Sequence, residues 1–457
     1  MTPLPRLTLA LILALILALF PFLSVHAQTD SNPTLQIPAA ARPGANFDVK
    51  AATDAWLATI PPDKKARSDS YFEGGYWLQL WDFLILAAIL FLLLQTRLSA
   101  RIRDWAERVT QRKHLQTLVY FLPVYLFVFL LQFPMSVYEG YFREHQYGLS
   151  TQNFAGWFRD QAVGLAVGLV LGAIALTILF AIVRRLGASW WVWGALASVV
   201  LLMFTVLIAP VYIAPLFNTY TKLTDPKVKD PILSMARANG IPATDVYEVD
   251  ESRQSNRVSA NVGGFWGTER ISLNDNLLKH CTPEEIITTM GHEMGHYVLN
   301  HVYKDIFFFA LFFLGSFAFL NWSLHWSLAR WGERWQIRGI TDVAVLPLAA
   351  LLLSVFFFLT TPIGNTWTRT QEYEADIFGL NAGRQPDGEA AVDLKLGDYR
   401  KLDPSPLEEF VFYDHPSGRT RITAAMRWKK ENRNILDEPS ADPKPLSMQG
   451  SQTRPSP

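Results

Sequence analysis

The chain has 457 residues, of which 50% are hydrophobic and 18% are charged. This apolar share is high for a soluble protein of that length, and apolar runs long enough to span a membrane account for it. The 41 basic residues equal the 41 acidic ones in number, so the composition implies no nucleic-acid partner. The only cysteine, Cys281, excludes an intramolecular disulfide and a cysteine-based zinc site. Any metal must therefore use histidine and carboxylate ligands.

The first 27 residues have the features of an export signal. Arg6 precedes the apolar run Leu7–Leu23, and Val25–Ala27 resembles a cleavage site with small residues. The run is long for a signal and short for a span, so residues 1–27 are expected to be either a cleaved signal peptide, the preferred interpretation, or a first transmembrane helix. In both cases residues 28–76, which are polar and rich in Pro and Ala, lie on the non-cytoplasmic side.

Six further apolar stretches are long enough to cross a bilayer, and they divide the rest of the chain. Four of them form an expected membrane bundle within residues 77–215, and two form a hairpin within residues 304–362. A domain outside the membrane is expected to combine residues 216–303 with residues 363–436, which are polar from residue 364 onward, and residues 437–457 have the composition of a disordered tail. The six stretches lie at about 77–96, 116–136, 161–183, 190–210, 304–323 and 342–362.

Basic residues orient these spans. Three alternate loops are rich in Arg and Lys and poor in acidic residues, which predicts that they are cytoplasmic. The domain outside the membrane then falls on the non-cytoplasmic side, in agreement with an exported N-terminus. The basic residues are Arg97, Arg101, Arg103, Arg108, Arg112 and Lys113 in the first loop, Arg184 and Arg185 in the second, and Arg330, Arg334 and Arg338 in the third.

The sequence His-Glu-Met-Gly-His at 292–296 is the pattern of a metallopeptidase helix. His292 and His296 are four residues apart, so both imidazoles leave one face of a helix and can bind one zinc ion. Glu293 points beside that face, where it can take a proton from a zinc-activated water and pass it to a leaving amine. The alternative is that both histidines cap or pack inside an ordinary helix.

Thr282-Pro283-Glu284-Glu285 predicts the start of this helix, because it offers an N-cap hydroxyl, a proline at the first position and a glutamate that completes a capping box. The helix is expected to continue through His301. That histidine lies off the ligand face, and we predict a polar residue near the membrane interface rather than a ligand.

A catalytic zinc needs a third protein ligand, and Glu372 is the best candidate. It follows the sixth span, on the same side of the membrane as His292. Asp376 is four residues further along, so it can accept a hydrogen bond from a ligand imidazole and fix its tautomer. The alternative is a solvated helix face, which is also the prediction for Glu374.

At these residues the chain resembles the integral-membrane zinc metallopeptidases of the CAAX prenyl protease 1 type. That family has a His-Glu-x-x-His helix, two spans, and then Ser-Arg-x-x-Glu-Tyr-x-Ala-Asp, whose glutamate is the third ligand. The second motif is matched by Arg369, Glu372, Tyr373, Ala375 and Asp376, with Thr368 in place of serine. Further blocks similar to the family lie at 147–152, 213–218 and 414–422.

The resemblance implies roles for two more residues. Asn261 falls where the family has an asparagine near the bound substrate backbone, and His415 falls where it has a histidine that assists the tetrahedral intermediate. From the residues themselves, Val258–Phe265 with its two glycines suits an edge strand to which an extended substrate could add. The resemblance also suggests that Arg421 orients acids near the metal. The segment around Asn261 departs from the family pattern: the family has His-Ser-Asn-Ala-Tyr, and residues 259–263 of this chain are Ser-Ala-Asn-Val-Gly.

The expected fold is an α-helical polytopic membrane protein with six or seven spans and a zincin-like α+β catalytic domain. The expected function is a membrane-embedded zinc metalloendopeptidase that holds one Zn²⁺ and acts on peptides or proteins, including membrane-associated ones, at the lipid bilayer. The expected location is a bacterial inner membrane, and the charge bias predicts that the catalytic domain lies on its non-cytoplasmic face. Two alternatives are a processor of prenylated CAAX C-termini and a non-catalytic membrane scaffold with a vestigial zinc site, against which Glu293 argues.

Overall fold

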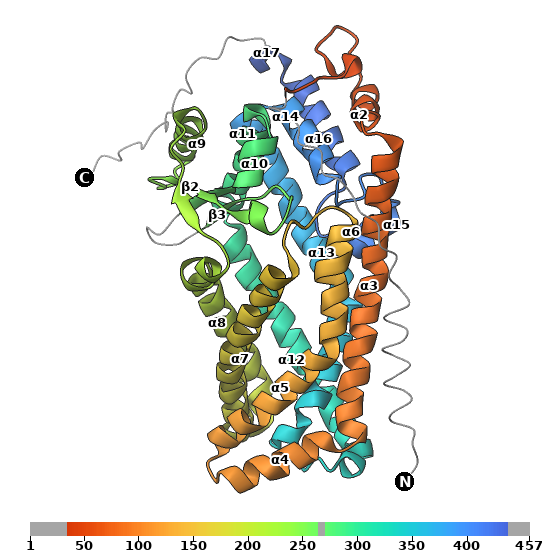
Figure 1. Cartoon of the computed structure of the whole chain (residues 1–457), viewed down its shortest axis with the longest axis vertical. Coiled ribbons are helices and arrows are strands. Elements are labelled where there is room, and N and C mark those ends of the chain that lie inside the picture. Colours follow the sequence, from red (N-terminus) through yellow and green to blue (C-terminus); the bar gives the residue numbers. More distant parts are fainter. Residues whose placement is uncertain (1–33, 264–269, 437–457) are drawn as a thin grey trace, which may run out of the picture.

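The computed structural model describes residues 34–263 and 270–436. In this part of the chain six helices are long and apolar enough to cross a membrane, as the six apolar stretches predict, and they run along the long axis of the molecule (Figure 1). The first and last residues, with the predicted signal or first span at 1–27 and the predicted tail at 437–457, lie outside the described residues. The six are α3 (Pro62–Gln95), α5 (Lys113–Val137, continued to Gln146), α7 (Phe154–Arg185), α8 (Trp190–Ile208), α12 (His301–Trp335) and α13 (Leu346–Gly383).

Several of these helices extend well beyond their apolar stretch, at the end where the domain outside the membrane lies. α3 begins at Pro62, with proline in the first turn, rather than near residue 77. α13 continues without a break from its apolar part through Gly383, and its polar part packs against α11 (Pro283–Val298). The membrane bundle and the domain outside it therefore share continuous helices.

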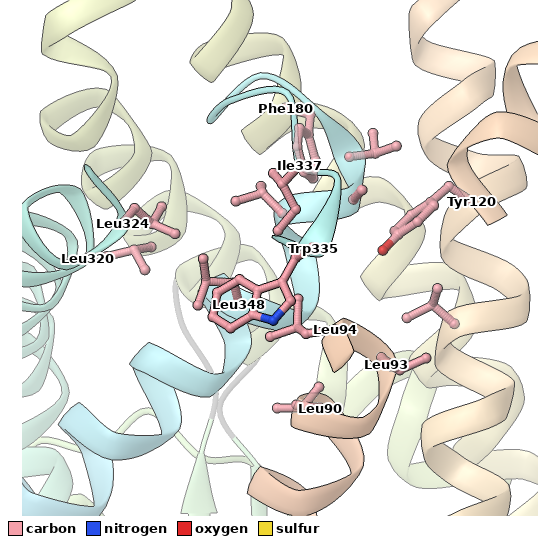
Figure 2. Close-up of a cluster of buried hydrophobic side chains, with 14 of the residues drawn as sticks. Leu90, Leu93, Leu94, Tyr120, Phe180, Leu320, Leu324, Trp335, Ile337 and Leu348 are labelled. Carbon is pink, nitrogen blue, oxygen red and sulfur yellow. The ribbon is translucent and has the colours of Figure 1, made fainter. Parts of the chain in front are cut away.

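A buried hydrophobic cluster closes the opposite end of the bundle, where α4 (Leu98–Val109) crosses beneath the other helices. Figure 2 shows Trp335 at the end of α12 and Ile337 just after it, surrounded by side chains of α3, α5, α7, α12 and α13. Arg103, counted above among the basic loop residues, is buried here and lies 2.5 Å from Asp342 and 2.8 Å from Asp104. The buried pair with Asp342 fixes α4 to the start of the short helix η7 (Val343–Val345), which leads into α13.

The other end carries a small mixed sheet. Its strands are β1 (Tyr220–Lys222), β2 (Val246–Val249), β3 (Ala260–Gly263) and β4 (Arg270–Asn274), in the order β1-β2-β4-β3. β2 and β4 are parallel and the other two pairs are antiparallel. The edge strand predicted within 258–265 is therefore confirmed as β3. A second hydrophobic cluster fills the space between the sheet, α9 (Pro226–Ala238), α10 (Asp275–His280) and α11 (Pro283–Val298).

The remaining helices of this end come from both termini of the described chain. α14 (Pro386–Leu396), α15 (Pro406–Phe412), α16 (Gly418–Glu431) and α17 (Arg433–Leu436) follow α13. The N-terminal helix α2 (Val49–Leu57) packs on α14 and α16, and Trp56 lies in their common hydrophobic cluster. Asp54 forms an ion pair with Arg419 at 2.7 Å. The segment before the first span is thus part of the same domain (Figure 1).

Candidate metal centre

The helix that carries His292 and His296 is α11, and it begins as predicted. The Thr282 hydroxyl accepts a hydrogen bond from the backbone of Glu285, and the Glu285 carboxylate accepts one from the backbone of Thr282. The predicted continuation through His301 is wrong. α11 ends at Val298, and Asn300 adopts a left-handed conformation with φ 58°, which asparagine tolerates better than most residues. α12 then begins at His301 in a new direction.

Small residues allow α11 and α13 to approach closely. A Cβ added to Gly295 would lie 3.1 Å from the Cα of Ala375, and one added to Gly291 would lie 3.0 Å from the carbonyl oxygen of Gly379. These contacts step along both helices by four residues in opposite directions, so α11 and α13 are antiparallel. The glycine in His-Glu-Met-Gly-His therefore has a packing role, because a larger side chain there would separate the two halves of the site.

This packing brings Glu372 to the two histidines. Among the described residues, His292, His296 and Glu372 form a group whose ligand atoms all lie within 4.8 Å of one another. His292 Nε2 is 3.1 Å from His296 Nε2 and 3.2 Å from Glu372 Oε2, and His296 Nε2 is 3.5 Å from Glu372 Oε1. Donor atoms at 2.0–2.1 Å from a tetrahedral zinc are about 3.3 Å apart. The three side chains therefore fit one zinc ion without rearrangement.

Asp376 orients the first of these ligands. Its Oδ1 accepts a hydrogen bond of 2.8 Å from His292 Nδ1, which leaves Nε2 facing the other two ligands. Burial alone would lower the pKa of His292, but hydrogen bonds to Asp376 and Glu372 hold that pKa well above its ordinary value. The surroundings of His292 thus favour a positive charge at this point, which is what a cation site requires.

Asp376 is itself held by Arg421 of α16, through bonds of 2.9 Å and 2.5 Å to its two oxygens. The same guanidinium lies 3.4 Å from Glu389 and 3.2 Å from Asp393, and all four side chains are buried. Burial raises the pKa of both Glu389 and Asp393. Nothing in the local sequence of α14 indicated that its acids lie behind the metal site, because they reach it only through the packing of α14 on α11 and α16.

Glu293 and His415 are placed beside the ligands. Burial raises the pKa of Glu293 to about 7, with the charge of His292 acting in the opposite direction. His415 lies in the connection between α15 and α16, and its Nε2 is 3.4 Å from Glu372 Oε2. Its Nδ1 is 2.7 Å from Asp414. The structure thus brings together six predicted side chains from three separate segments of the sequence. They are His292, Glu293, His296, Glu372, Asp376 and His415.

Two further predictions concern residues at the edge of this group. Asn261 is exposed on edge strand β3 and borders a cavity of about 340 Å³ between the sheet and the end of α8. The candidate ligand group does not include His301, which is the first residue of α12, the helix that contains the fifth apolar stretch. This histidine is 2% exposed and contacts both His296 and Glu374. Glu374 is exposed, as predicted for a solvated helix face, and its carboxylate also forms an ion pair with Lys304 at 2.6 Å.

Comparisons with known proteins agree with this geometry. The family described as Peptidase family M48 matches residues 222–429, and the one described as CAAX prenyl protease N-terminal, five membrane helices, matches residues 50–219. The uncharacterized metalloprotease YhfN of Bacillus subtilis is 32% identical over 346 residues, 75% of this chain and 80% of its own length. The human CAAX prenyl protease 1 homolog is 26% identical over 382 residues, 73% of this chain and 78% of its own. The crystal structure of S. mikatae Ste24p has the same fold, with a TM-score of 0.68 at 21% identity, over 85% of this chain and 92% of that one.

Proposed function

The chain belongs to peptidase family M48 and is a membrane metalloendopeptidase, and we propose that it holds one zinc ion through His292, His296 and Glu372. The observation that carries the proposal is the spacing of their donor atoms, 3.1 to 3.5 Å, which is that of a tetrahedral zinc site with one position left open. Zinc in such a site supplies Lewis acidity toward a carbonyl oxygen and makes a water molecule a stronger acid.

In this proposal Glu293 moves the protons. Its carboxylate accepts one proton from the attacking water, and the same oxygen later donates it to the nitrogen of the leaving amine. A general base is most effective when its pKa lies near the working pH, and burial gives Glu293 a pKa of about 7. The partly buried position beside His292 keeps this carboxylate within the site but out of bulk water.

His415 is proposed to stabilise the charge that develops on the carbonyl oxygen. Its Nε2 faces the ligand group, 3.4 Å from Glu372, while its Nδ1 donates to Asp414. In its cationic form the ring can therefore donate from Nε2 to the oxyanion while Asp414 fixes its orientation. Donors of this kind typically contribute about 3–4 kcal/mol to lowering the barrier.

The substrate is proposed to bind as an extended peptide along β3. On its outer side β3 has no strand among the described residues, and the polar side chain of Asn261 borders the cavity of about 340 Å³ there. Main-chain hydrogen bonds to such an edge would set the register of the peptide beside the metal ligands. A second cavity, of about 770 Å³, lies among α3, the π-helical segment η2 (Tyr138–Arg143) and α7, and it offers room for a membrane-associated segment.

The membrane side of the catalytic domain is proposed from charge alone. The three basic loops lie together at the α4 end of the bundle, and α11, which carries two of the proposed ligands, lies toward the opposite end (Figure 1). In the proposed bacterial inner membrane, the positive-inside rule then favours the ligands on the non-cytoplasmic face. The substrates would accordingly be exported or membrane peptides. Processing of prenylated C-termini, which the names of several relatives describe for those proteins, would require a cytoplasmic face and is less favoured.

The decisive experiment compares Glu293→Gln with wild type in detergent, using casein or a fluorogenic peptide and measuring bound zinc in the same samples. We expect Glu293→Gln to retain zinc and to lose turnover by about 10²–10⁴-fold. A matched control is Glu284→Gln, an acid in the first turn of the same helix. Cleavage by Glu293→Gln at the wild-type rate would refute its role as base, and cleavage insensitive to a zinc chelator would refute the metal site. A prenylated and an unprenylated peptide of one sequence then distinguish the two substrate classes.

A further inference from the structure

Both ring nitrogens of His296 are engaged, and this fixes the position of its proton. Nε2 faces Glu372 and His292, so in the proposed zinc site it must present its lone pair. A neutral imidazole carries one proton, which must then be on Nδ1. Nδ1 of His296 lies 2.9 Å from Nδ1 of His301, so the hydrogen bond between them runs from His296 to His301.

His301 is held so that it can accept this hydrogen bond. Because its Nδ1 is the acceptor, its own proton must be on Nε2, which lies 3.1 Å from Glu374 Oε2 and donates to it. The His301 ring is almost completely buried, whereas Lys304 anchors Glu374 from the solvent side at 2.6 Å. Each donor in the series therefore has an acceptor, and the direction of the series is set by the metal-facing nitrogen of His296.

We propose that His301 is a positioning residue for the second zinc ligand, which extends the proposed zinc site by a relay from His296 through His301 to Glu374. The first ligand, His292, donates directly to a carboxylate, that of Asp376. The second, His296, donates to the neutral imidazole of His301, and His301 in turn donates to the carboxylate of Glu374. Such outer partners fix the tautomer and the ring orientation of a ligand histidine. The relay gives His296 this support without a buried carboxylate bonded directly to its ring, such as Asp376 provides for His292.

The break in the helix at Asn300 is what makes this relay possible. In an uninterrupted helix a residue five positions after His296 would lie about 140° around the axis from it, so the two rings could not meet. The left-handed backbone of Asn300 ends α11 and turns the chain, and His301 becomes the first residue of α12. Glu374 and Lys304 are then supplied by α13 and by the first turn of α12. The relay thus ties the metal ligand to both helices of the membrane hairpin.

The test is the rate at which purified zinc-loaded protein in detergent releases zinc to a chromogenic chelator. His301→Met keeps a side chain of similar volume but removes the acceptor, and we expect release about 10–100-fold faster than from wild type. His301→Gln keeps an acceptor oxygen and should restore most of the retention. The matched control is His325→Met, because His325 lies on the same helix and, within residues 34–263 and 270–436, bonds only to the carbonyl of Asn321. Equal release from His301→Met and wild type would overturn the proposal, as would fast release from His325→Met.

Two additional variants keep the result decisive. Glu374 is partly exposed, so Glu374→Ala should fold even where His301→Met does not. It removes the last acceptor of the relay, and we expect zinc release to be several-fold faster; release at the wild-type rate would count against the relay. Glu372→Ala removes a proposed ligand. Release from Glu372→Ala at the wild-type rate would overturn the ligand assignment itself, whereas fast release from that variant together with wild-type release from His301→Met would overturn the relay alone.

Discussion

Replacing Gly379 with alanine tests whether the close contact between α11 and α13 holds the metal centre together. An alanine Cβ at this position would lie 2.8 Å from the backbone nitrogen of His292, 3.2 Å from its Cα and 3.3 Å from the carbonyl carbon of Gly291. All three contacts are with backbone atoms, so no side chain can rotate away. Ordinary contacts of this kind begin near 3.4 Å, so the two helices must separate locally by about 0.6 Å.

The consequence for the site is larger than the consequence for the fold. Glu372 and Asp376 belong to one helix and His292 to the other, so the distances of 3.2 Å and 2.8 Å between them increase with the separation. Metal–ligand distances tolerate about 0.2 Å, and a 1 Å misplacement can reduce catalysis about 100-fold. Overpacking costs about 1–3 kcal/mol, but alanine gains about 1 kcal/mol over glycine within a helix. We therefore expect at most about 2 kcal/mol of destabilisation.

The assay measures kcat/KM, bound zinc and the thermal unfolding midpoint of Gly379→Ala in detergent. We expect activity to fall by about 10–100-fold and zinc to be released faster, with a small decrease in the midpoint. Gly364→Ala is the matched control, since Gly364 lies on the same helix and a Cβ there meets nothing within 4 Å. It should retain activity and unfold at an equal or higher temperature. Wild-type activity and zinc retention in Gly379→Ala would refute the reasoning.

Two other outcomes follow from charged groups. In the metal-free protein, Asp376 helps to hold the pKa of His292 well above its usual range despite burial, so zinc must displace a proton below that pKa. We expect zinc affinity to weaken about tenfold per pH unit in that range, and a calorimetric affinity that does not change from pH 7 to pH 6 would contradict this. At the other end of the molecule, Asp342→Asn deprives Arg103 of its buried partner. We expect a destabilisation of about 3 kcal/mol, the low end for such pairs because Asp104 remains in contact, and an unchanged unfolding midpoint would contradict it.

Local patterns in the sequence were sufficient to predict the spans and to select the candidate ligands. Apolar length identifies a membrane helix whatever its neighbours are, and the spacing of His292 and His296 fixes one helical face. The capping box at Thr282 depends only on four consecutive residues, and the structure has it as predicted. Glu372 was a candidate because it follows a span on the correct side. The other inferences need only residues within one element, whereas that for Glu372 also needs the order and orientation of the spans.

Contacts between elements could not be predicted in the same way. The acids behind Asp376 come from α14 and meet Arg421 of α16 only after three helices have packed together. The role of His301 depends on a left-handed residue before it, and Asn300 alone is a weak signal for such a break. Gly291 and Gly379 gave no indication of a contact, because the sequence does not contain the register of two antiparallel helices. The missed residues are therefore those that support the ligands rather than the ligands themselves.

The site is also inseparable from the membrane hairpin. Glu372 lies on the same uninterrupted helix as the sixth span, ten residues beyond residue 362, or about 15 Å along the axis. His301 begins the helix that forms the fifth span. Helices hold side chains more firmly than loops do, so this arrangement gives accurate positions to a ligand and to its support. The same continuity keeps the metal ligands within a few turns of the apolar segments, because moving them away would require breaking α12 or α13. Proximity to the bilayer is thus a consequence of how the ligands are held.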